Sequence, residues 1–121
     1  MRFRRYAVAA ATLMLMNASA AQADVSINII DAPRPQEKWG YAPAARKVDV
    51  GTWVTWSNNG QDSHTVTADD GSFDSGNLDP SEGFSWYFDT PGTYTYICAY
   101  HGWMTGKVTV VAATDAGSSA D

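Results

Sequence analysis

Short alternating segments closed by turns run through residues 25–111, and none of this stretch carries a long helical period. Residues 52–58 show the alternation, with Val54 and Trp56 on one face and Trp53 on the other. Segments of this kind, separated by Gly-, Pro- and Asn-rich turns, predict an all-β, single-domain Greek-key β-sandwich of seven to eight antiparallel strands. The expected strands are residues 25–30, 46–50, 52–58, 63–68, 84–88, 93–99 and 106–111.

The start of the chain has the pattern of an export signal. Three arginines precede an apolar run over residues 6–16, and the small residues AQA follow at 21–23. This order predicts a secretory signal peptide and a periplasmic protein, with an uncleaved membrane anchor as the alternative and the choice between general and twin-arginine export left open. The predicted division is a cleaved signal peptide at residues 1–23, a domain at residues 24–111 and a flexible tail at residues 112–121.

The part of the chain after the signal is strongly acidic. It holds all 13 acidic residues and five of the eight basic ones, which gives a formal net charge of −8. Such a charge disfavours binding to nucleic acid or to an anionic membrane surface, and it suits a basic protein partner as well as plain solubility. We therefore expect no nucleic-acid partner and no membrane insertion once the signal is removed.

A single cysteine stands in the segment YICAYHGWMTGKVTV, where Cys98, His101 and Met104 have the spacing C-x-x-H-x-x-M. One cysteine cannot form an internal disulfide, so an exported thiol has to pair between chains, react or bind metal. The other histidine, His64, lies 34 residues before Cys98, and only the tertiary fold can bring it to the same place.

Two imidazoles, a thiolate and a thioether form the donor set of a blue-copper electron-transfer site, whereas a thioether is not a usual zinc ligand. Each residue alone has a plainer explanation, as a strand-end histidine or as a core cysteine or methionine. Their joint spacing favours one copper ion, cycling between Cu(I) and Cu(II), at one end of the sandwich. The candidate ligands are His64, Cys98, His101 and Met104, the last as an axial donor of the kind that varies most.

The segments GTWVTWSNNGQDSHTVT and FDSGNLDPSEGFSWYFDTPGTYTYICAYHGWMTGKVTVV resemble the cupredoxins, the type 1 copper proteins of the plastocyanin/azurin family. The short C-x-x-H-x-x-M spacing is most similar to that of amicyanins. The resemblance covers residues 25–111 and implies an eight-stranded sandwich, one bound copper and single-electron shuttling between larger redox proteins. Matched position by position, it implies the same four ligands.

Two departures from the family pattern concern the surroundings of the implied site. Thr65 stands where relatives often have an asparagine that ties down the ligand loop, and a hydroxyl can replace that amide only in part. Tyr100 and Gly102 flank His101 where many relatives have prolines. Changes around the ligands tune reduction potential and ligand pKa. We expect His64 to be buried and His101 to reach the surface, with Trp103 either in an apolar docking rim or packed over the metal.

The function predicted from these features is a periplasmic electron carrier rather than an enzyme. Both histidines of the chain are used by the implied site, which leaves none for an open catalytic copper site. A periplasmic copper chaperone or storage protein with the same ligands is the alternative, although such proteins often bind through Met- and His-rich stretches. The expected partners of a monomer are a redox-protein donor and acceptor, such as a dehydrogenase and a c-type cytochrome or oxidase.

Overall fold

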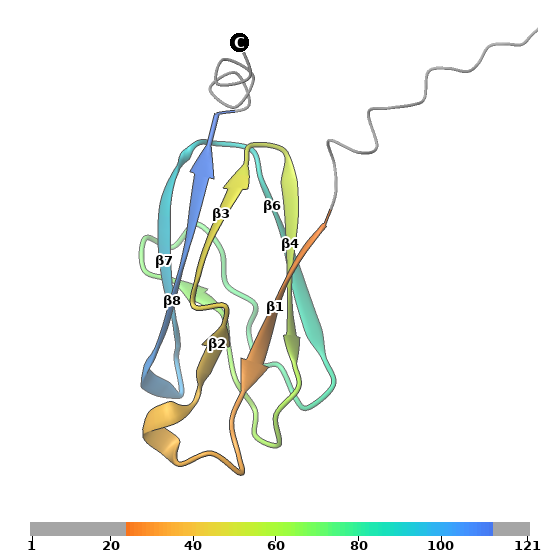
Figure 1. The fold of residues 1–121 in the computed structure, drawn as a ribbon, viewed down its shortest axis with the longest axis vertical. Helices are drawn as coiled ribbons and strands as arrows, with labels where there is room; N and C mark the ends of the chain where they lie inside the picture. Colours follow the sequence, from red (N-terminus) through yellow and green to blue (C-terminus); the bar gives the residue numbers. More distant parts are fainter. Residues whose placement is uncertain (1–23, 113–121) are drawn as a thin grey trace, which may run out of the picture.

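Two four-stranded sheets pack face to face in the computed structural model, which describes residues 24–112 (Figure 1). The predicted signal peptide at residues 1–23 and all but the first residue of the predicted tail at residues 112–121 lie outside the described residues. The elements are β1 (Val25–Ile30), the 3-10 helix η2 (Gln36–Lys38), β2 (Gly40–Ala42), β3 (Ala45–Asp49), β4 (Thr52–Asn58), β5 (Thr67–Ala68), β6 (Gly83–Phe88), β7 (Gly92–Cys98) and β8 (His101–Val111).

The strand order is β2-β1-β4-β6 in one sheet and β3-β8-β7-β5 in the other. The chain changes sheet at every connection from β2 to β7, as expected of a Greek-key sandwich. The prediction of a Greek-key β-sandwich of seven to eight strands is therefore confirmed, with eight strands observed. The expectation that all strands are antiparallel is wrong, because β1 pairs with β4 and β3 pairs with β8 in parallel. Neither parallel pair is consecutive in the chain, so no turn signal could have indicated it.

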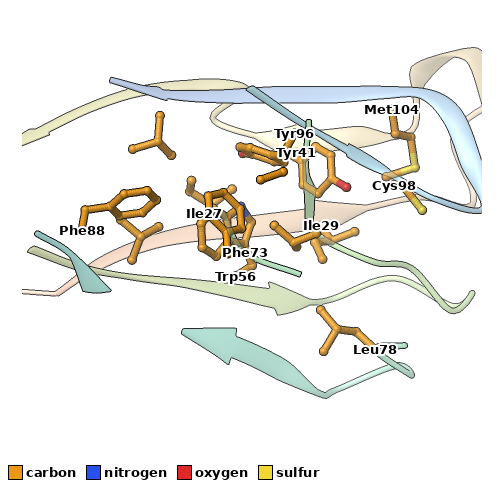
Figure 2. Packing of buried hydrophobic residues seen from close by; sticks show 14 of the residues in the cluster. Ile27, Ile29, Tyr41, Trp56, Phe73, Leu78, Phe88, Tyr96, Cys98 and Met104 are labelled. Carbon is orange, nitrogen blue, oxygen red and sulfur yellow. The ribbon is translucent and has the colours of Figure 1, made fainter. Parts of the chain in front are cut away.

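Alternating side chains fill the space between the sheets. In β4, Val54 and Trp56 are fully buried while Trp53 keeps 43% of its surface exposed, as the alternation predicts. In β7, Tyr96 and Cys98 are fully buried on one face. A Cβ at Gly106 of β8 would overlap the Tyr96 ring, so the missing side chain makes room for it. Figure 2 shows the aromatic core, with Cys98 at one end of it.

Three stretches differ from the predicted elements. Only Thr67–Ala68 of the expected strand at 63–68 is a strand, and His64 is held instead by an isolated bridge to Leu78. The connection after β1 contains η2 and β2, which its prolines had concealed. Strand β8 begins at His101 rather than at residue 106, because a register shift after Ile97 brings Cys98 opposite His101. Within residues 24–112, no helix is long and apolar enough to cross a membrane.

Candidate metal centre

The two histidines and the cysteine of the chain meet at one end of the sandwich. One candidate ligand atom from each of His64, Cys98 and His101 lies within 4.8 Å of those of the other two. Cys98 Sγ is 3.8 Å from His64 Nδ1 and 3.4 Å from His101 Nδ1. The structure thus brings together residues that are 34 positions apart, as the sequence predicted.

The backbone explains how these side chains reach one place. His64 exchanges two backbone hydrogen bonds with Leu78, of 3.0 and 2.8 Å, which fixes it although it lies outside the strands. Cys98 ends β7 and His101 begins β8, so a tight turn sets them opposite each other. Met104 follows on the inner face of β8, fully buried, and Figure 2 shows its side chain beside that of Cys98.

The four candidate ligands differ in their exposure to solvent. His64, Cys98 and Met104 have no exposed surface, whereas His101 is partly exposed. This agrees with the expectation that His64 is the inner imidazole and that His101 reaches the surface. The donors present are two nitrogens and two soft sulfurs, a set that fits copper in both oxidation states better than it fits zinc.

Thr65 ties the turn between β7 and β8 to the His64 segment. The backbone N–H of Ala99 donates a hydrogen bond of 2.8 Å to Thr65 Oγ1. The Thr65 carbonyl in turn accepts a hydrogen bond of 2.6 Å from the Tyr41 hydroxyl. The Thr65 hydroxyl therefore accepts a hydrogen bond from the turn that carries the ligands, which is the role expected of the asparagine in relatives.

Aromatic rings surround the exposed edge of the site. The Trp39 ring lies edge-on to both imidazoles, with centroid distances of 6.1 Å to His64 and 5.3 Å to His101. Trp103 is 5.3 Å from His101, and its Nε1 donates a hydrogen bond of 2.7 Å to the Gln36 carbonyl. Because Trp103 also stays 48% exposed, it packs beside the site and forms part of its rim.

Sequence reasoning missed two residues of this region, Asp31 and Trp39. Asp31 is buried at the end of β1, and its Oδ2 lies 2.7 Å from His64 Nε2. Burial raises the pKa of Asp31, but hydrogen bonds from His64 and from the backbone of Asp62 and Gln61 outweigh it and lower the pKa below 3.8. Its one sequence signal is an acidic residue directly after an apolar strand. Trp39 carries no spacing signal at all.

The charge of the Cys98 sulfur follows from its neighbours. Burial raises the pKa of the thiol, but the contacts with the His64 and His101 imidazoles and the hydrogen bonds from the backbone of Thr65 and Tyr100 outweigh it and lower the pKa to about 6. For His64, burial lowers the pKa, and the contacts with Cys98 and Asp31 raise it above 6.5. The site therefore favours a thiolate, the form of cysteine that binds metal.

In the metal-free protein we expect the Cys98 thiol to titrate near pH 6, compared with an ordinary pKa of 9.0. Because folding lowers this pKa, ionisation of Cys98 contributes to the free energy of unfolding. The contribution is fully present above about pH 9, and it is lost as the pH falls through about 6. Ultraviolet absorbance of the thiolate measures the titration without ambiguity, since the chain has one cysteine. The urea-unfolded protein is the control and should titrate near the ordinary value. A folded protein that titrates there as well would contradict the assignment.

Comparisons with known proteins identify the family of this fold. Residues 5–110 match the family model described as a cupredoxin-like domain. Plastocyanin from Scenedesmus fuscus is 34% identical over 83 residues, which cover 58% of this chain and 85% of that protein. Amicyanin-alpha from Methylorubrum extorquens is 35% identical over 69 residues, covering 53% of this chain and 58% of that protein. The structure of a purple cupredoxin from Nitrosopumilus maritimus superposes with a TM-score of 0.66 at 30% identity, covering 73% of this chain and all of that one.

Proposed function

The chain belongs to the cupredoxin-like domain family, and from this premise we propose that it is a type 1 copper protein that carries single electrons between larger redox proteins. Cupredoxins bind one copper ion. The observation that carries the proposal is the convergence of His64, Cys98 and His101 within 4.8 Å, with Met104 buried beside them. These four residues are the proposed ligands.

Bound copper supplies a one-electron change between Cu(I) and Cu(II). The residues around it limit movement during that change. Cys98 and His101 end and begin two paired strands, and a hydrogen bond from Ala99 to Thr65 holds the turn between them. His64 is held at its backbone by Leu78 and at Nε2 by Asp31. A donor set fixed in this way keeps the rearrangement small, which favours fast electron transfer.

His101 is the proposed path of the electron to the surface, because it is the only one of the four candidate ligands with exposed surface. The aromatic rim of Trp39, Tyr100 and Trp103 gives it an apolar border, with Tyr100 52% exposed and Trp103 48% exposed. Exposed aromatic side chains are common at protein interfaces and suit docking to a partner. We propose a redox-protein donor and acceptor as partners, such as a dehydrogenase and a c-type cytochrome or oxidase.

The proposed location is the periplasm, reached through cleavage of a signal peptide at residues 1–23, with the copper domain at residues 24–111. The proposed working form is a monomer. Relatives of the plastocyanin and amicyanin type are electron carriers rather than enzymes, which supports the absence of a catalytic role.

The visible spectrum and redox behaviour of the copper-loaded protein test the proposal. We expect an intense blue band from thiolate-to-copper charge transfer, reversible one-electron reduction and fast electron self-exchange. Slow self-exchange together with rapid transfer of copper to a metal-free target would support a chaperone or store instead. Three of the four candidate ligands are fully buried, so a copper acceptor could reach only His101 directly. A pale or metal-free protein would end the proposal.

A further inference from the structure

Asp31 is a buried carboxylate that touches the candidate site from outside it. It directly follows β1 and keeps 1% of its surface exposed. Burying a carboxylate is costly unless hydrogen bonds compensate for the lost water. The partners of its two oxygens therefore show what the protein uses this position for.

Two kinds of donor meet the carboxylate. The backbone N–H of Gln61 lies 2.8 Å from Oδ1 and 3.0 Å from Oδ2, and that of Asp62 lies 3.0 Å from Oδ2. The third donor is the imidazole of His64, whose Nε2 is 2.7 Å from Oδ2. An ionised carboxylate only accepts hydrogen bonds, so Nε2 has to carry the proton. The other ring nitrogen, Nδ1, is then free to face Cys98 Sγ at 3.8 Å.

The turn that supplies the backbone donors is itself held in place. The N–H of Asn59 donates to the Ile29 carbonyl at 3.1 Å, and its side-chain amide donates to Asn28 Oδ1 at 2.7 Å. A Cβ at Gly60 would overlap the Asp31 carboxylate, so the glycine leaves the space that the carboxylate fills. The turn thus holds the Asp31 carboxylate in place through backbone hydrogen bonds, and Oδ2 also accepts a hydrogen bond from His64.

We propose that Asp31 is a positioning residue that holds His64 in the Nε2–H form and places a buried negative charge beside the copper site, which lowers its reduction potential. The inference rests on the proposed function. A negative charge favours the oxidation state with the larger positive charge, and it does so more strongly in a buried site than in water. Carboxylates that accept a hydrogen bond from a ligand histidine also orient the ring and raise its basicity.

The variant Asp31→Asn removes the charge and keeps the shape. We expect Cu(II) affinity to fall by about 10–100-fold, the usual cost of losing such a partner. The loss should be about ten-fold larger for Cu(II) than for Cu(I), which corresponds to a rise of about 59 mV in reduction potential. Voltammetry of the copper-loaded protein measures the potential, and competition with chelators of each oxidation state measures the two affinities.

Asn59→Ala is the matched control, because it loosens the same turn from β1 without touching Asp31 or His64. A purely structural Asp31 predicts that both variants lower the melting temperature and leave the potential unchanged. A potential in Asp31→Asn no higher than in Asn59→Ala would overturn the inference. A wild-type protein without the blue band would instead end the proposed function, so the two failures are distinguishable.

A second measurement uses the wild-type protein, so it tests the inference even if the Asp31→Asn variant does not fold. In the wild-type Cu(I) form, which is diamagnetic, proton NMR should show the His64 Nε2 proton shifted downfield and slow to exchange with water, because a buried carboxylate accepts it. The partly exposed His101 provides the comparison within the same spectrum. Rapid exchange of the His64 proton, equal to that of His101, would overturn the inference.

Discussion

The Cys98→Ala variant is expected to lose the intense blue band completely while remaining folded. The band requires a sulfur that donates charge to copper, and the chain has no second cysteine to supply it. Copper affinity should fall by more than the roughly 10–100-fold that losing a hydrogen-bond partner of a ligand costs. The fold should survive, because the change removes one small sulfur from the end of the core, at a cost of about 1–2 kcal/mol. Visible absorption and circular dichroism together measure both effects.

Met104→Leu is the matched control, since it removes the other sulfur at the same end of the core and conserves volume. The thiolate remains in this variant, so we expect the blue band to persist with a changed intensity and potential. A Cys98→Ala protein that stays blue would contradict the proposed ligand set. A folded Met104→Leu protein that loses its band would show that the sulfur roles are assigned wrongly.

Much of the site could be predicted because its residues are close in sequence. Cys98, His101 and Met104 span seven residues, and the chemistry of their side chains already excludes most other uses. Including His64 depended on an assumption about the fold, because 34 residues separate it from Cys98. The alternation of β4 and β7 supported that assumption, since Trp56, Tyr96 and Cys98 had to point into one core.

The parts that sequence reasoning missed depend on pairing between distant segments. The contact of Asp31 with His64 exists because β1 pairs in parallel with β4, which sets the end of β1 beside the turn after β4. No local pattern encodes that register. In the same way, β2 is three residues long and follows a proline-rich connection, too short for a period to be recognised. The extension of β8 back to His101 depends on the register shift after Ile97 rather than on propensity.

Trp56 is the largest of the fully buried side chains, so we expect its truncation to lower the stability of the sandwich strongly. Its ring lies 5.4 to 5.8 Å from the rings of Tyr96, Phe73 and Phe84, and so joins both sheets. Trp56→Ala should cost about 3–5 kcal/mol, because truncation leaves a cavity that the surrounding rings can only partly fill. That is a large fraction of the 5–15 kcal/mol typical of a domain, so the variant should be largely unfolded at modest urea concentrations.

Trp53→Ala is the control from the same strand, three residues away and on the opposite face. Trp53 is 43% exposed and packs mainly on Tyr87 at a centroid distance of 5.2 Å, so its loss should cost about 1 kcal/mol or less. Urea denaturation of the metal-free proteins compares the two without a contribution from copper binding. Equal losses from the two variants would contradict the core described here. The two residues lie in the same strand and have the same side chain, so they differ only in burial. Because Trp56 lies on the inward face of β4, we expect Trp56→Ala to lose more of the free energy of unfolding than Trp53→Ala.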